Sequence, residues 1–166
     1  MRIVIIGGGA GGLLAALMLQ KDGHDVTVVE RDPEPPPPDD EDAWGSWDRR
    51  GVSQLRQPHG FIGRTRETLA TEVPDVWTRV GEIDTYRIDL RRFAPDQDAL
   101  TESDERLQYD VMRRTTFERT VSVVAEATQG IDVRRGVVVV GLVSDRSMDG
   151  VPIVTGVRTK EQGEIS

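Results

Sequence analysis

Six consecutive residues near the N-terminus carry the clearest chemical signal in the sequence. Residues 7–12 read Gly-Gly-Gly-Ala-Gly-Gly, which satisfies the pattern G-x-G-x-x-G through Gly7, Gly9 and Gly12. In this pattern the first glycine permits a tight turn, the second lets the backbone approach a pyrophosphate, and the third allows a helix to pack closely on a strand. The start of that helix offers unpaired backbone N–H groups and a partial positive charge to the phosphates. The spacing therefore predicts a dinucleotide site.

An acidic residue, Glu30, stands 18 positions after the last glycine of this pattern. It ends a segment that reads as a strand, so its carboxylate is placed to accept hydrogen bonds from both hydroxyls of an adenosine ribose. Because a carboxylate repels a 2′-phosphate, FAD or NAD is favoured over NADP here. The spacing does not separate FAD from NAD. A glycine-rich loop in an unrelated sheet is the alternative interpretation.

The elements around the motif are those that a dinucleotide site requires. Residues 2–6 read as a strand buried on both faces, residues 13–20 as a buried helix that ends before Gly23, and residues 25–30 as a second strand. Residues 1–32 therefore form a βαβ unit of the usual length. Residues 33–48 follow as an acidic, proline-rich loop, which we expect to lack regular structure because prolines and acids fill its first ten positions.

The remainder of the chain is less regular. Thr115 and Glu118 have the spacing of a capping box at the start of a helix that Gly130 ends. Further helices are expected at residues 62–73 and 76–80, and strands at residues 107–112, 131–134, 137–143 and 152–159. The last strands suggest a small antiparallel meander. The predicted fold class is therefore α/β, a Rossmann-like FAD/NAD(P)-binding fold with a parallel sheet and a small meander.

Arginine accounts for 19 of the 21 basic residues. Five arginines and no acid lie in residues 49–66, directly behind the acidic loop. Converging guanidinium groups suit a dianionic pyrophosphate at a helix N-terminus. The alternative is that these arginines are solvated and only balance the acidic loop.

Four segments together resemble a known family. The glycine motif, V-V-E-R at residues 28–31, R-R-G-V-S-Q with Q-P-H-G-F at residues 49–61, and R-R-T-T-F-E-R-T at residues 113–120 resemble the N-terminal half of FAD-dependent monooxygenases of the aromatic-hydroxylase type. The resemblance extends over nearly the whole chain, although only the glycine motif is specific by itself. It implies FAD as cofactor, NAD(P)H as co-substrate, and oxygenation of a small organic substrate with O2.

The resemblance also implies particular contacts. An arginine matching Arg49 or Arg50 reaches the FAD pyrophosphate, the pattern R-x-x-[LF]-E places Arg114 near the ribityl chain and phosphates, and the backbone near Val138 contacts the adenine. The full set of cofactor-binding residues that we expect is Gly7, Gly9, Ala10, Gly11, Gly12, Glu30, Arg31, Arg49, Arg50, Arg114 and Val138. No residue can be assigned as a catalytic acid or base. His59 could lie beside the isoalloxazine or be an ordinary loop histidine.

Composition excludes several other classes of function. The sequence has two histidines and no cysteine, so it offers few ligands for a transition-metal site. The lack of cysteine also fits a cytoplasmic protein. A net charge of −8 without an aromatic-studded basic stripe disfavours nucleic-acid binding. The apolar N-terminal stretch is shorter than a membrane span and is interrupted by glycines, so we expect neither an anchor nor a secretion signal.

The length of 166 residues suffices for one domain. Family members continue with a D-A-x-G-type strand, a G-D segment and a substrate domain, none of which this sequence contains. We therefore expect residues 1–166 to form a partial FAD-binding domain, C-terminally incomplete and inactive alone. The alternatives are an NAD-binding or flavin-reductase-like oxidoreductase of another family, and a non-catalytic Rossmann-like nucleotide-binding module.

Overall fold

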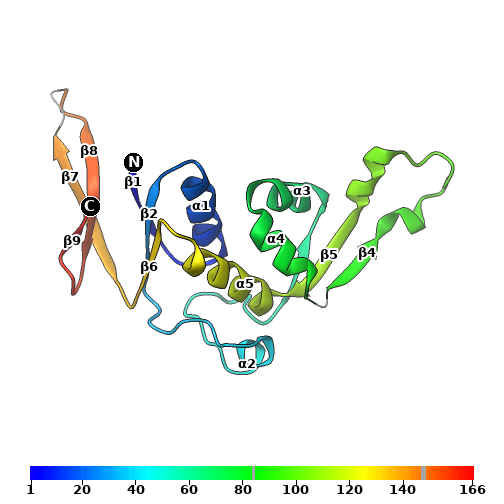
Figure 1. Cartoon of the computed structure of the whole chain (residues 1–166), viewed down its shortest axis with the longest axis horizontal. Helices are drawn as coiled ribbons and strands as arrows, with labels where there is room; N and C mark the ends of the chain where they lie inside the picture. The colour runs from blue at the N-terminus through cyan, green and yellow to red at the C-terminus, as the bar shows by residue number, and fades with distance from the viewer. Residues whose placement is uncertain (84, 147–148) are drawn as a thin grey trace. The chain divides into compact units, whose positions relative to one another are not determined.

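The computed structural model describes residues 1–83, 85–146 and 149–166. The chain divides into two compact units, whose helices and strands are labelled along the ribbon in Figure 1. The first unit consists of Met1–Pro36 and Val121–Ser166, and the second unit consists of Pro37–Thr120.

A three-stranded parallel sheet forms the centre of the first unit. Strands β1 (Arg2–Ile6), β2 (Asp25–Glu30) and β6 (Ile131–Arg135) lie in the order β1-β2-β6. Helix α1 (Ala10–Lys21) connects β1 to β2 and buries Leu13, Ala16 and Leu17. The predicted βαβ unit is therefore confirmed. Strand β1 lies at the edge of this sheet, and the side chain of Ile6 at its end is 56% exposed.

The second sheet of the first unit is the predicted antiparallel meander. It contains β7 (Val139–Arg146), β8 (Pro152–Thr159) and β9 (Glu164–Ile165) in that order. Its side chains share one buried apolar cluster with the parallel sheet, made of Val29, Val137, Val157 and Ile165 with Val4 and Val139 packed against it. The meander therefore packs on the parallel sheet, and the predicted fold class is confirmed.

The second unit is built around an antiparallel sheet of order β3-β5-β4. Aromatic rings pack between its elements: Phe61 lies 4.5 Å from Phe117 and 6.4 Å from Trp77, measured between ring centroids. The elements of this unit are α2 (Asp40–Gly45), β3 (Pro58–Phe61), α3 (Gly63–Glu72), α4 (Pro74–Gly81), β4 (Tyr86–Asp89), the 3-10 helices η1 (Leu90–Phe93) and η2 (Glu102–Leu107), β5 (Gln108–Arg113), and the first half of α5 (Arg114–Ala127).

Two local expectations were wrong. The proline-rich segment is not irregular throughout, because helix α2 begins at Asp40, where the Asp39 carboxylate accepts a hydrogen bond from the Asp42 backbone N–H at 2.8 Å. Acidic residues in a first turn also complement the helix dipole. The predicted capping box at Thr115 does not form either, since α5 already begins at Arg114 and the Glu118 carboxylate binds arginines instead.

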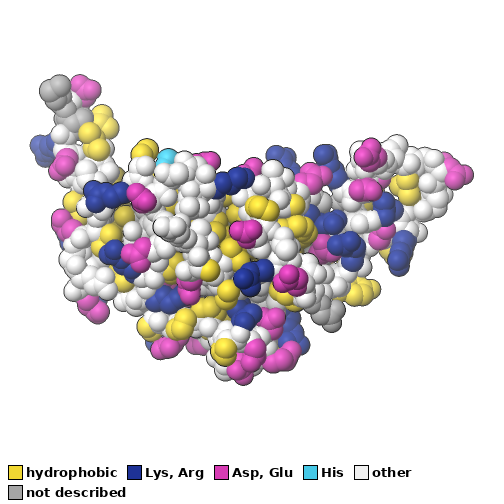
Figure 2. Space-filling model, in the orientation of Figure 1, with side chains coloured by type: hydrophobic (Ala, Val, Ile, Leu, Met, Phe, Trp, Pro, Cys, Tyr) yellow, Lys and Arg dark blue, Asp and Glu magenta, His cyan; other side chains and the backbone are white. Residues whose placement is uncertain are grey.

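Arginines from β5 and α5 neutralise part of the acidic segment. Arg113 pairs with Glu41 at 2.7 Å, and Arg119 pairs with Asp40 at 3.3 Å while donating to the carbonyl oxygens of Pro37 and Pro38. Acidic and basic side chains are interspersed on the face drawn in Figure 2. Within the described residues, no helix is long and apolar enough to cross a membrane.

Candidate functional site

The glycine motif forms a tight turn between β1 and α1 in the first unit. Gly7 has a φ of +105°, a conformation that favours glycine, and its N–H donates to the Val29 carbonyl at 2.8 Å. Gly9 is the N-cap residue of α1, and no side chain makes a capping hydrogen bond to this helix end. The first-turn N–H groups of α1 are thus left for another acceptor, as a phosphate site requires.

Two glycines of the motif differ in what a side chain would meet. A Cβ at Gly12 would lie 2.0 Å from the Gly7 carbonyl oxygen, so the helix packs directly on the turn at this position. A Cβ at Gly9 or Gly11 would meet no atom of the described chain within 4 Å, apart from its chain neighbours and the backbone of its own helix. Gly12 therefore serves close packing, whereas the lack of a side chain at Gly9 keeps open the space in front of the helix.

Glu30 is fixed against the glycine turn. Its carboxylate is 4% exposed and accepts hydrogen bonds from the backbone N–H of Gly8 at 2.7 Å and of Asp32 at 2.9 Å, each to a different oxygen. A Cβ at Gly8 would lie 2.9 Å from the Glu30 Cβ. Gly8, the middle one of three consecutive glycines, is thus a residue of the candidate site that the pattern G-x-G-x-x-G does not specify.

The remaining predicted residues of the first unit flank this turn. Ala10 begins α1, and Arg31 is exposed directly after β2. Val138 lies between β6 and β7 and is 40% exposed, with its carbonyl accepting from the Lys160 N–H at 2.9 Å. The neighbouring Val137 N–H donates to the Glu30 carbonyl at 2.9 Å. This bond brings the Val138 segment to the carboxyl end of β2, the end at which open α/β sheets bind ligands.

The second unit holds a buried charged triad, which we define as Arg49, Arg114 and Glu118. The Glu118 carboxylate is 2% exposed and pairs through one oxygen with Arg49 at 2.9 Å and through the other with Arg114 at 2.7 Å. Each oxygen of the carboxylate thus fixes the position of one guanidinium group, and guanidinium groups held in this way are suited to bind an anion.

The structure distinguishes the two candidate arginines at positions 49 and 50. Arg49 is 6% exposed, and its guanidinium carbon lies 5.4 Å from the ring centroid of Trp47. Arg50 is exposed. The buried carboxylate of Glu118 and the indole of Trp47 fix the position of the Arg49 guanidinium, so Arg49 fits the expected role better.

His59 lies beside this triad in strand β3. Its ring packs against Phe61 at 4.8 Å and stacks on Phe117 at 5.8 Å between centroids. Burial lowers the pKa of the His59 imidazole below its usual 6.5, the positive charge of Arg114 lowers it further, and Glu118 partly opposes these effects. The imidazole is therefore neutral near pH 7, in a strand rather than in a loop.

Comparison with known proteins places these features in context. A model of the family described as FAD dependent oxidoreductase matches residues 2–47, which include the glycine motif and Glu30. No curated protein matches the sequence.

Solved structures of flavoproteins share the fold. PqsL, a probable FAD-dependent monooxygenase from Pseudomonas aeruginosa, is 15% identical with a TM-score of 0.62; the match covers 99% of this chain and 39% of PqsL. The p-nitrophenol 4-monooxygenase PnpA from Pseudomonas putida DLL-E4 is 16% identical with a TM-score of 0.59, over 98% of this chain and 37% of PnpA. The flavin-dependent halogenase CmlS is 20% identical with a TM-score of 0.58, over 99% of this chain and 27% of CmlS.

The comparisons and the structure agree on the class of fold. The chain has the Rossmann-like fold of the N-terminal part of flavoproteins that include FAD-dependent monooxygenases, and its first 47 residues carry the sequence signature of FAD dependent oxidoreductases. The resemblance inferred from the sequence is thus confirmed at the level of the fold. The chain spans well under half of the length of each of these three structures.

Proposed function

We propose that this chain binds FAD and forms the N-terminal part of a flavoprotein monooxygenase. The observation that carries the proposal is the Glu30 carboxylate, which two backbone N–H groups hold beside the uncapped start of α1. A carboxylate and a phosphate-binding helix start at this spacing suit the ribose and the pyrophosphate of one adenosine diphosphate group. The family signature over residues 2–47 supports FAD as the bearer of that group.

The residues of the glycine turn fit the proposed cofactor. The backbone N–H groups of residues 9–12 would bind the pyrophosphate, because no protein atom lies within 4 Å of the position that a Cβ at Gly9 or Gly11 would take. Glu30 would accept the ribose hydroxyls at the carboxylate that the Gly8 and Asp32 N–H groups hold in place. Arg31 would add positive charge beside it, and the backbone at Val138 would contact the adenine.

In the second unit, we propose Arg49 and Arg114 as the arginines that contact FAD. The resemblance assigns this role to the segment containing Arg49 and Arg50, and the buried pair between Arg49 and Glu118 favours Arg49. Arg114 shares the same carboxylate, so both guanidinium groups are positioned by Glu118. Arg50 would contribute only long-range positive charge.

FAD, when bound, would supply the redox chemistry, with NAD(P)H as reductant and O2 as oxidant in the whole enzyme. The protein would contribute binding, orientation and exclusion of water. The flavin monooxygenases that share the fold support a small organic substrate. The absence of cysteine supports a cytoplasmic location.

The test is a titration of the purified chain with FAD, followed by flavin fluorescence and by identification of the released chromophore. We expect Gly9→Val to weaken FAD affinity at least about 100-fold, equivalent to about 2.7 kcal/mol, because the new side chain occupies the space of the pyrophosphate. The matched control is Gly141→Val in β7, where a Cβ also meets no atom within 4 Å. This variant should bind FAD as the unmodified chain does.

Two outcomes would overturn the proposal. Unchanged FAD affinity in Gly9→Val would show that the glycine turn is not the pyrophosphate site. Binding of NADH without binding of FAD would assign the chain to the NAD-dependent alternative.

A further inference from the structure

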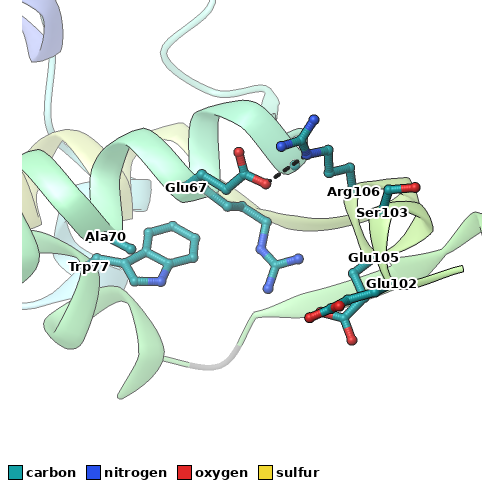
Figure 3. Close-up of a pocket in the computed structure, with 9 residues that line it drawn as sticks. Glu67, Ala70, Trp77, Glu102, Ser103, Glu105 and Arg106 are labelled. Atoms are coloured by element: carbon teal, nitrogen blue, oxygen red, sulfur yellow. Dashed lines mark hydrogen bonds and ion pairs between the residues drawn. The ribbon is translucent and has the colours of Figure 1, made fainter.

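A cavity of about 570 Å³ lies within the second unit, and neither the glycine turn nor the triad contributes to it. Its walls are one face of α3, the indole of Trp77 from α4, and the side chains of η2 (Figure 3). The volume is within the range of sites that bind small molecules. None of its lining residues is among the cofactor-binding residues expected from the sequence.

The wall formed by η2 is held firmly in place. A Cβ at Gly63 would lie 2.6 Å from both the Cα and the carbonyl oxygen of Arg106, so the start of α3 and the end of η2 are in direct backbone contact. A capping box between Thr101 and Asp104 fixes the other end of η2. Hydrogen bonds from the Thr101 backbone N–H and hydroxyl lower the pKa of the Asp104 carboxyl, which is therefore ionised at neutral pH.

Positive charge on one side of the cavity comes from Arg66. Its Nε lies 2.9 Å from Oδ2 of Asp110, and Arg87 binds the other oxygen of the same carboxylate at 2.7 Å. Asp110 is only 3% exposed and can neutralise only one of the two arginines. The side chain of Arg66 is 22% exposed and lines the cavity, so the excess charge is within reach of a ligand.

Negative charge comes from η2. Glu102 and Glu105 are three residues apart, a spacing at which side chains on a 3-10 helix lie above one another. Figure 3 shows both residues on the opposite side of the cavity from the Trp77 indole. The nearby Arg106 donates to Glu67 at 2.9 Å, so the charges of these two lining residues cancel each other.

We propose that this cavity binds a small amphoteric molecule with an aromatic group, of the chemical class of an aromatic α-amino acid. The carboxylate of the ligand pairs with Arg66, its ammonium group pairs with Glu102 and Glu105, and its ring packs on Trp77. Arg66 is held by the ion pair between its Nε and Asp110 and by a hydrogen bond of 3.4 Å from Nη1 to the Gln108 carbonyl, and its Nη2 is a further donor that suits the carboxylate of the ligand. This site is independent of the proposed FAD site.

The experiment is a binding titration of the whole chain with three probes, followed by isothermal calorimetry and amide NMR shifts. The probes are L-phenylalanine, phenethylamine, which lacks the carboxylate, and 3-phenylpropionate, which lacks the ammonium group. We expect saturable binding of L-phenylalanine, with shifts at the amides of α3 and η2, and at least tenfold weaker binding of each analogue. Failure of all three probes to bind, or shifts outside the second unit only, would overturn the proposal.

Charge-neutral variants test the two ends of the ligand separately. The double variant Glu102→Gln with Glu105→Gln should remove the preference for L-phenylalanine over 3-phenylpropionate. Arg66→Gln should remove the preference over phenethylamine, while Arg87 still pairs with Asp110. Glu82→Gln, an exposed residue just after α4, is the matched control and should change nothing. Unchanged preferences in the double variant and in Arg66→Gln would overturn the proposal, whether or not the chain binds FAD.

Discussion

The two units of this protein use different chemistry to position charge. In the first unit, backbone groups do so: the Glu30 carboxylate is held by the N–H groups of Gly8 and Asp32, and the start of α1 is left uncapped. In the second unit, side chains hold one another, since Glu118 lies between two arginines and Asp110 between two others. The first arrangement depends on the local path of the chain, and the second on side chains from separate elements.

This difference predicts which substitutions each unit tolerates. A backbone site fails when a side chain is added where the chain must approach itself closely. A site made of ion pairs fails when a buried charge loses its partner, because an uncompensated charge in the interior is costly. The following experiments test that contrast.

We expect the largest effect from Gly12→Ala. The added Cβ would lie 2.0 Å from the Gly7 carbonyl oxygen, so the turn or the helix must move, and the free energy of unfolding should fall by more than about 3 kcal/mol. Urea unfolding followed by circular dichroism measures this. Gly11→Ala is the control one residue earlier, in the same helix and with no atom within 4 Å of the new Cβ. It should be neutral or stabilising by up to about 1 kcal/mol. Equal losses in both variants would show that helix propensity, not close packing, governs this turn.

The next effect in size concerns the triad. Glu118→Ala leaves Arg49 buried without its carboxylate, and we expect it to lower the free energy of unfolding by about 3 kcal/mol. Glu67→Ala removes a carboxylate from the exposed pair with Arg106 and should cost no more than about 1 kcal/mol. Urea titrations of both variants give the comparison. If the two losses were the same, the burial of the triad would contribute nothing to its strength.

The smallest effect is a dependence of stability on pH through His59. Its pKa is lowered in the folded protein from the ordinary 6.5, so the unfolded chain binds more protons as the solution becomes acidic. The contribution of neutral His59 to the free energy of unfolding is complete above about pH 6.5. It is lost as the pH falls through that value toward the lower pKa of His59 in the folded state. We expect His59→Gln to show a shallower loss of stability between neutral and mildly acidic pH. Thermal unfolding over this range measures it, and an identical pH profile in both proteins would contradict the assignment.

How much of each unit the sequence could predict follows from the same contrast. The glycine turn and Glu30 lie within residues 7–30, in the order strand, turn, helix, strand, so local pattern was sufficient for the βαβ unit. The bond between Arg49 and Glu118 joins residues 69 positions apart, and no local pattern reports it. For this reason the sequence left Arg49 and Arg50 as equal candidates.

Short elements escaped prediction for a related physical reason. Strands β3 and β4 have four residues each, and both are completed by hydrogen bonds to the intervening strand β5. The strand propensity of both segments, Pro-His-Gly-Phe and Tyr-Arg-Ile-Asp, is too low to predict a strand from the local sequence. The capping box at Thr115 failed because the carboxylate of Glu118 has stronger partners in two guanidinium groups than in one backbone N–H.

Strand β1 has a consequence for handling the purified chain. It lies at the edge of a parallel sheet, is almost entirely aliphatic, and exposes 56% of the Ile6 side chain. The main-chain N–H and C=O groups on its outer side form a template on which another β-strand can hydrogen-bond. Such an edge promotes pairing between molecules at high protein concentration, and a charged residue in place of Ile6 should reduce that pairing.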